Sequence, residues 1–299
     1  MASPRGQTGD TEAEPIRVLC LASVPHSGST ILGNLLGQLD GFMTIGELFY
    51  LSVGLEHSNP CGCGRQLVDC PVWQQVFAEA FGTENPLEQV RPDRYYVALR
   101  QLPRLLARPQ SAEHFRDVWS RLFSAVAETT GARVIVDTSK SPSYFEIVRR
   151  CDRVEPYMLH LVRHPVATAR SWAKIEGITS PPWVHGLIWD GWNVAIEARW
   201  ASRRGRYLRV RYEDFATSPA DTLLAIADFV GEQPAALPVT SDGTAQLGVT
   251  HTVAGNDSRF VQGDVPIRLD DEWRRAMPAA QSKVIAATTW PLRRRYGYA

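Results

Sequence analysis

Short apolar runs that alternate with helical segments constrain the fold of this chain more than any other feature. The runs, rich in Val, Ile and Leu, cover residues 17–22, 133–136, 157–162 and 207–210. Helical periodicity follows or separates them over residues 30–39, 71–81, 114–129, 165–174, 184–202 and 219–230. Strands that are apolar on both faces are typical of parallel sheets covered by helices. The pattern therefore predicts an α/β fold, a three-layer sandwich around a central parallel sheet.

The length fits one domain with elaborations. The chain has 299 residues, of which 44% are hydrophobic and 21% charged, and a chain of this size buries about 75% of its unfolded surface. Residues 1–15 are polar and predict a disordered tail, which leaves 16–299 as a single domain. Because clear strands are missing early in the stretch of about 48–130, we expect a lid-like insertion there.

Charge and targeting signals exclude several classes of function. The 32 basic residues equal the 32 acidic ones, so no overall positive field attracts nucleic acid. The N-terminal sequence lacks a secretory signal, and no apolar run is long enough for a membrane span. Five cysteines are an odd number for a disulfide framework. We expect a cytoplasmic protein with reduced thiols, and the sequence leaves its oligomeric state open.

The segment PHSGST at residues 25–30 follows the first predicted strand and leads into a helix. Small residues, hydroxyls and the N–H groups of a helix start can together cradle a phosphate or sulfate. A simply capped helix explains the segment equally well. No lysine stands where a nucleoside-triphosphate P-loop needs one, which disfavours an ATPase. The candidate anion-binding residues are His26, Ser27, Gly28, Ser29 and Thr30.

Arg163 follows the third predicted strand, and Pro165 after it suits a first helical turn. Ser171 lies eight residues beyond Arg163 on that helix. An arginine at a strand end can present a bidentate fork to a phosphate. Taken alone, Arg163 is as readily a structural ion-pair partner.

The two segments together resemble the sulfotransferases that use 3′-phosphoadenosine 5′-phosphosulfate (PAPS). In that family a P-[RK]-S-G-[ST]-[ST] loop binds the 5′-phosphosulfate, and an Arg with a Ser eight positions later binds the 3′-phosphate. Residues 25–30 are similar to the first motif, and Arg163 with Ser171 to the second. The resemblance implies a P-loop-like sulfotransferase architecture, PAPS as co-substrate and PAP as product.

Later segments extend the resemblance to most of the chain. The run RYEDF at 211–215 is similar to a family segment whose Tyr lies near the adenine, which implies that role for Tyr212. The run around Arg259 is similar to a late loop that lays an Arg across the 3′-phosphate. Two positions depart from the family pattern: His26 replaces a basic residue, and Ile31 stands where some members have an aromatic residue against the adenine.

The resemblance also implies catalytic residues. Glu47 matches a Glu that serves as general base in several carbohydrate and tyrosine sulfotransferases, and a surface or capping carboxylate is the alternative. Lys140, after the strand at 133–136, would stabilise the bridging oxygen as PAP leaves, unless it only pairs with Asp137. His26 would supply a part-time cation beside the sulfuryl group.

The remaining polar and aromatic clusters fit structural roles. Cys61, Cys63 and Cys70, with His57 upstream, have the residue types of a zinc site, but C-x-C departs from the usual C-x₂₋₄-C spacing. We therefore expect reduced thiols or a local disulfide there, and no metal. The helical stripe of tryptophans within 184–202 indicates core packing first. The alternative is acceptor binding by Trp183, His185 or Trp189.

The sequence thus predicts a PAPS-dependent sulfotransferase that acts on a hydroxyl of a small-molecule, lipid or glycan acceptor by in-line transfer. One alternative is a small-molecule kinase, with Asp137 as its magnesium-binding carboxylate. The other is a nucleotide-binding module without catalysis, which the His26 substitution keeps open.

Overall fold

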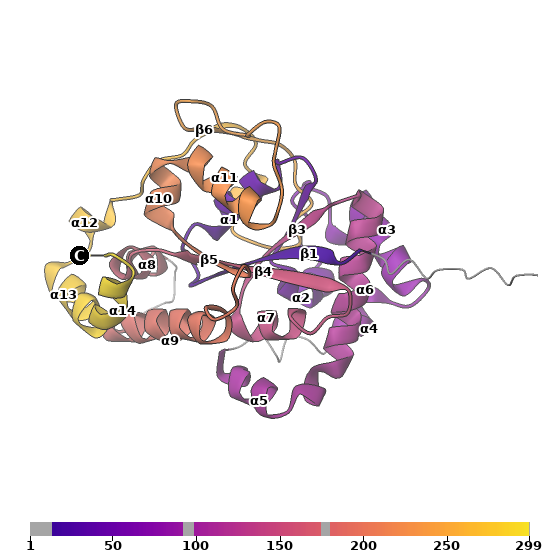
Figure 1. Cartoon of the computed structure of the whole chain (residues 1–299), viewed down its shortest axis with the longest axis horizontal. Coiled ribbons are helices and arrows are strands. Elements are labelled where there is room, and N and C mark those ends of the chain that lie inside the picture. The colour runs from indigo at the N-terminus through magenta and orange to yellow at the C-terminus, as the bar shows by residue number, and fades with distance from the viewer. Residues whose placement is uncertain (1–13, 92–98, 175–179, 299) are drawn as a thin grey trace, which may run out of the picture.

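A five-stranded parallel sheet forms the centre of the molecule, with strand order β2-β3-β1-β4-β5 (Figure 1). The computed structural model describes residues 14–91, 99–174 and 180–298. The strands are β1 (Ile16–Ser23), β2 (Phe42–Gly46), β3 (Val134–Lys140), β4 (Val154–Val162) and β5 (Tyr207–Arg211). The predicted parallel α/β sheet is therefore confirmed, and each of the four strands expected from the sequence is present.

The edge strand β2 was not predicted as a strand. It has five residues, and its sequence FMTIG contains a threonine and ends in a glycine. β2 pairs in parallel with β3, with Phe42 opposite Val134. This pairing brings the residue after β2 to the same sheet edge as the other strand ends.

Helices cover both faces of the sheet, as a strand with two buried faces requires. Leu19 and Leu21 of β1 face the layer that contains α1 (Ser29–Leu36), α10 (Tyr212–Thr217) and α11 (Pro219–Phe229). Val18 and Cys20 face the layer of α6 (Glu113–Thr130), α7 (Pro142–Val148) and α9 (Pro182–Trp200). The two layers lie above and below the strands in Figure 1. Each predicted helix is present, with ends shifted by at most a few residues.

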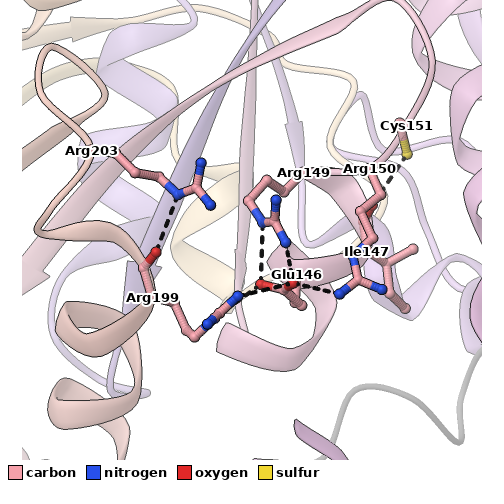
Figure 2. A network of polar contacts seen from close by, with 7 residues as sticks. All are labelled: Glu146, Ile147, Arg149, Arg150, Cys151, Arg199 and Arg203. Atoms are coloured by element: carbon pink, nitrogen blue, oxygen red, sulfur yellow. Dashed lines mark hydrogen bonds and ion pairs between the residues drawn. The ribbon is translucent and has the colours of Figure 1, made fainter. Parts of the chain in front are cut away.

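A buried carboxylate ties two helices of the lower layer together. Glu146 of α7 pairs with Arg149 and Arg150 of its own segment and with Arg199 of α9, as Figure 2 shows. The side chain of Glu146 is only 1% exposed, so a single unpaired charge there would be costly. Three guanidinium groups offset the free-energy cost of burying this carboxylate, and the one from Arg199 fixes α7 against α9.

Residues 48–130 are helical wherever the structure describes them, apart from loops and an isolated β-bridge. The segment comprises α2 (Leu51–Glu56), α3 (Pro71–Phe81), α4 (Pro86–Val90), α5 (Leu102–Ala107) and α6, with short 3₁₀ turns at Leu48–Tyr50, Leu67–Asp69, Leu99–Gln101 and Pro109–Ala112. Its last helix, α6, packs in the core beneath β1 and against α3. That part belongs to the sandwich itself. A lid role for the helices before it remains a prediction.

The C-terminal third adds a second small sheet and a cluster of short helices. The stretch 237–269 contains an antiparallel pair, β6 (Thr244–Leu247) with β7 (Gly263–Pro266), and a 3₁₀ turn at Asp257–Phe260. Beyond it, α12 (Trp273–Ala276), α13 (Ala279–Thr288) and α14 (Trp290–Arg295) gather near α8 (Pro165–Trp172) (Figure 1).

Two expectations concern the ends and the surface of the chain. Residues 1–13 of the predicted disordered tail lie outside the described residues. Among the residues that are described, no helix combines the length and the apolar character needed to cross a bilayer.

Candidate active site

Each strand of the main sheet ends beside a residue that the sequence singled out. The loop at residues 25–30 follows β1, Glu47 follows β2, and Lys140 is the last residue of β3. Arg163 follows β4, and Tyr212 follows β5. Parallel strands bring their carboxyl ends to one edge of the sheet, where ligands bind in open α/β folds.

A cavity of about 460 Å³ opens at this edge. Its lining brings together most of the predicted site residues, namely His26, Gly28, Ser29, Thr30, Glu47, Lys140, Arg163 and Ser171. Ser27, Tyr212 and Arg259 are not among the residues that line it. Hydroxyls, backbone N–H groups and two cations thus face the same space, which is the donor set that a polyanionic ligand requires.

The turn at residues 25–30 depends on a glycine. Gly28 has φ 89° and is the residue before the first turn of α1. A Cβ atom built on it would lie 2.6 Å from Cδ2 of Tyr212, so a side chain has no room there. Tyr212 therefore supports the loop from beneath, which explains why it is absent from the cavity lining.

Glu47 and Lys140, which both line the cavity, form an ion pair. Each side chain is only 11% exposed, so the pair is screened less than a surface pair. Lys140 has φ 65°, a left-handed conformation that is rare for a non-glycine residue. Its carbonyl oxygen accepts a 3.2 Å hydrogen bond from Nε1 of Trp192. The alternative to a catalytic role, in which Lys140 only pairs with Asp137, is wrong, because Lys140 pairs with Glu47.

Arg163 is fixed by three contacts. Its guanidinium donates to the carbonyl oxygen of His26 at 2.9 Å and to Oδ2 of Asp270 at 2.7 Å. Trp189 Nε1 donates to the Arg163 carbonyl oxygen at 2.9 Å. Although burial opposes ionisation of Asp270, the hydrogen bond and the charge of Arg163 lower the pKa of that carboxyl. Arg163 therefore couples the anion-binding loop to the segment that carries Asp270.

His26 lies among positive charges. Burial, followed by the charges of Lys140 and Arg163, lowers the pKa of His26 below its ordinary value, and Glu47 opposes the shift. The imidazole is accordingly neutral near pH 7 in the free protein. His26 has φ 67°, and the neighbouring Pro25 carbonyl oxygen accepts a 3.1 Å hydrogen bond from Nε1 of Trp172.

Besides Tyr212, two predicted residues lie outside the group that lines the cavity. The Ser27 hydroxyl is buried and has no hydrogen-bond partner among the described residues. Arg259 donates to the carbonyl oxygens of Gly255 and Pro60, each at 2.9 Å. These bonds connect Arg259 to the backbone at Gly255 and Pro60, while Asn256 and Ser258 of the same loop line the cavity. The contact of Arg259 with the 3′-phosphate stays a prediction.

The sequence did not single out several residues that line the cavity. Phe49 and Tyr50 lie two and three residues after Glu47, and their tilted rings have centroids 3.8 Å apart. Trp192 also lines the cavity, whereas Trp189 of the same helix is buried and Trp183 is 48% exposed. Helical spacing identified the tryptophan stripe, but the place of each ring depends on tertiary packing. The position of Phe49 and Tyr50 shortly after Glu47, a predicted site residue, was the signal that was available for them.

Asp137 has the surroundings of a structural carboxylate. It is fully buried and accepts hydrogen bonds from the Ser139 hydroxyl and, at 2.8 Å, from the Tyr144 hydroxyl. Burial raises the pKa of Asp137 to about 6. It does not line the cavity, so it offers no carboxylate to a magnesium ion there.

The three clustered cysteines meet a different histidine from the one expected. Cys61, Cys63 and Cys70 come together with His251, and the ligand atoms of all four lie within 4.8 Å of one another. His57, the expected fourth member, is exposed and is not part of this group. The partner was out of reach of the sequence because His251 is about 180 residues away.

Comparisons with known proteins agree with this geometry. A family model described as "Sulfotransferase family" matches residues 19–235. The sulfotransferase domain of the Synechococcus PCC 7002 olefin synthase is 20% identical, with a TM-score of 0.56 and 99% of each chain covered. The sulfotransferase domain from the curacin biosynthetic pathway is 18% identical, with a TM-score of 0.54, and the match covers 96% of this chain and 99% of that one.

No curated protein matches the sequence, and at these identities the two structures show a shared fold. The family match covers most of the chain and includes the loop at 25–30, Glu47, Lys140, Arg163 and Ser171. The chain therefore belongs to the sulfotransferase family, as its motifs predicted, and it is an enzyme that takes its sulfuryl group from PAPS.

Proposed function

We propose that this enzyme transfers the sulfuryl group in line from PAPS to a hydroxyl of a small-molecule, lipid or glycan acceptor. The observation that carries the proposal is the Glu47–Lys140 ion pair in the lining of the cavity. A carboxylate that could accept a proton and a cation thus lie side by side in the cavity that the anion-binding loop and three aromatic residues, Phe49, Tyr50 and Trp192, also line.

PAPS, the sulfuryl donor, fits the polar residues that line the cavity. The 5′-phosphosulfate would bind to residues 26–30, where the backbone N–H groups at the start of α1 and the Ser29 and Thr30 hydroxyls face the cavity. The 3′-phosphate would bind to Arg163 and Ser171, which line the same space. The buried Ser27 hydroxyl is a further donor for an anion in the loop.

The chemistry then needs one proton acceptor and one cation. Glu47 takes the proton of the acceptor hydroxyl while that oxygen forms a bond to sulfur. The bond from sulfur to the bridging oxygen breaks, and its electron pair stays on the 5′-phosphate of PAP. Lys140 stabilises that oxygen. Arrival of the phosphosulfate draws Lys140 away from Glu47 and thereby frees the carboxylate to act as a base.

The acceptor would enter along the three aromatic residues of the cavity lining. Phe49, Tyr50 and Trp192 line the cavity, and Tyr50 is 41% exposed. Aromatic faces suit the rings or chains of an apolar body that carries a hydroxyl. A nucleic-acid acceptor is not expected because the chain has no net positive charge. Location in the cytoplasm stays a prediction.

Transfer of a labelled group tests the proposal. The full chain is incubated with a hydroxyl-rich metabolite extract and with either sulfur-labelled PAPS or γ-phosphate-labelled ATP. We expect a labelled product from PAPS alone, and none with the Glu47→Gln variant. Label from ATP would indicate a kinase. Tight binding of PAP without transfer to any fraction of the extract would indicate the non-catalytic module.

A further inference from the structure

A second polar cluster lies apart from the active-site cavity, where the loop at 60–70 meets the segment at 250–256. Sγ of Cys61 is 3.6 Å from Sγ of Cys70, and Sγ of Cys70 is 3.2 Å from Nδ1 of His251. Cys63 completes the group, in which all four ligand atoms lie within 4.8 Å of one another. None of these four residues lines the cavity.

These separations have the size of a tetrahedral metal site. With zinc–sulfur distances near 2.3 Å, two thiolates on one tetrahedral zinc ion lie about 3.8 Å apart. Three sulfurs and one imidazole nitrogen form the Cys₃His set of closed structural zinc sites. Cys61 and Cys70 are fully buried, so the group is a built part of the interior and not a chance gathering of surface thiols.

The loop that carries Cys61 and Cys63 is folded so that both face inward. Pro60 and Gln66 form an antiparallel bridge, and the Cys61 N–H donates to the Arg65 carbonyl oxygen at 2.8 Å. The glycine between the two cysteines lies against the other segment: a Cβ on Gly62 would be 2.8 Å from the carbonyl oxygen of Thr250. The short C-x-C spacing thus allows the sulfurs of Cys61 and Cys63 to reach the same point, because the chain reverses direction tightly here.

Backbone donors surround the sulfurs. The N–H of Cys63 faces the sulfur of Cys61, and the N–H groups of Val72 and Trp73 face the sulfur of Cys70. Such donors stabilise thiolates, the form that binds metal. A divalent cation is what would favour the thiolates in so buried a place.

His251 is also held in position. Its carbonyl oxygen accepts a 2.7 Å hydrogen bond from Nε1 of Trp73, which is itself fully buried. Nδ1 of His251 is the ring nitrogen that faces Cys70, and a neutral imidazole binds metals through such a nitrogen. We propose that Cys61, Cys63, Cys70 and His251 bind one zinc ion in a closed structural site. Binding releases the protons of the three thiols.

The site would connect two parts of the chain at the edge of the active site. The segment after His251 runs beside β2: the Val253 N–H donates to Ile45, and the Glu47 N–H donates to the Ala254 carbonyl oxygen at 3.1 Å. Arg259, further along, donates to Pro60, next to Cys61. The zinc ion would therefore hold the backbone that positions Glu47 without touching any reactant. This inference does not depend on which acceptor the enzyme uses.

Metal content and a cobalt spectrum test the proposal. The full chain, produced with zinc in the medium, should retain one zinc ion per chain after dialysis. Replacement of zinc by Co²⁺ should give the visible bands of a tetrahedral thiolate site. In Cys63→Ser and His251→Gln the affinity for zinc should fall. The fall should exceed the roughly 10–100-fold loss of affinity that follows removal of an outer-shell partner. His57→Gln, an exposed neighbour, should keep it.

The contrary outcomes are equally specific. Absence of zinc and of any cobalt spectrum in the parent protein would overturn the proposal, as would retention of zinc by both ligand variants. A thiol titration of the denatured, metal-free protein should find five free thiols. Loss of two thiols to a bond between Cys61 and Cys70 would replace the zinc site with a disulfide. Cys63 is only partly buried, so its Ser variant should fold even if a change at Cys70 does not.

Discussion

Asp270 accepts a 2.7 Å hydrogen bond from the guanidinium of Arg163, the residue proposed to bind the 3′-phosphate. The Arg163 side chain is 7% exposed and the Asp270 side chain 45%, so the carboxylate lies on the solvent side of a buried cation. A phosphate that reaches Arg163 from the cavity meets a guanidinium that is already engaged. Asp270 therefore competes with the nucleotide for this arginine.

Arg163→Ala should remove the preference for the 3′-phosphate. A charge-assisted hydrogen bond contributes roughly 1.5–3 kcal/mol, so PAP should bind more weakly by at least that amount. Arg163 also holds the carbonyl oxygen of His26, and this part of the loss should affect AMP as well. Calorimetry with PAP and AMP, which differ only in the 3′-phosphate, separates the two contributions. Equal losses for both nucleotides would limit Arg163 to a support for the loop.

Asp270→Asn should have the opposite effect on PAP. The variant keeps a hydrogen-bond acceptor for Arg163 but removes the competing negative charge, so the affinity for PAP should rise while that for AMP changes little. Asp270 is partly exposed, and the gain should be on the order of 1 kcal/mol or less. The gain should shrink at high salt. Weaker PAP binding in this variant would show that Asp270 orients the guanidinium for the phosphate.

Glu47→Gln tests the proposed base. Glutamine has nearly the same size and accepts hydrogen bonds, but it does not take up a proton at neutral pH, so kcat should fall on the order of 10²-fold or more. PAP affinity should be retained or should rise, since Lys140 loses its charged partner. Steady-state kinetics together with PAP titration give both values. Near-normal turnover would assign the proton to another group.

Gly28→Ala should disrupt the loop more than an ordinary glycine substitution does. The new methyl group would lie 2.6 Å from the Tyr212 ring at a φ of 89°, whereas Gly205 has φ 68° and open space around it. We expect Gly205→Ala to cost about 1–2 kcal/mol in unfolding free energy, from the left-handed backbone alone. Gly28→Ala should cost more and should abolish PAP binding. Urea denaturation of both variants measures the two losses of unfolding free energy. Equal losses would contradict a steric conflict between residue 28 and Tyr212.

The sequence was informative where contacts are local. Strands buried on both faces, a glycine-rich turn before α1 and Pro165 at the start of α8 all follow from patterns within a few residues. The pairing of Glu47 with Lys140 depends on the register of β2 against β3, and β2 was not recognised as a strand. The contact of Arg259 with Pro60 and that of His251 with Cys70 could not be predicted from local patterns either. In both contacts the two residues lie about 180 residues or more apart in the chain.

The last prediction concerns the charge of His26. In the free protein, burial and the nearby Lys140 and Arg163 lower its pKa below the ordinary value of 6.5. A bound phosphosulfate adds negative charge beside the ring and should raise the pKa again. If the reaction needs the imidazolium, activity falls as pH rises through the pKa of His26. The alkaline limb of kcat/KM, which reports the free enzyme, should then lie below pH 6.5, and that of kcat at higher pH.

Two substitutions at this position isolate the charge. His26→Lys supplies a cation that titrates near 10.4 in its unperturbed state, so it should remove the alkaline limb between about pH 7 and 9. His26→Gln keeps an N–H donor without charge and should be slow at every pH. Neither change adds a left-handed glycine, so the backbone at φ 67° is strained alike in all three proteins. An alkaline limb that stays in place in His26→Lys, or a fully active His26→Gln, would make His26 a neutral donor and leave Lys140 as the cation at the sulfuryl group.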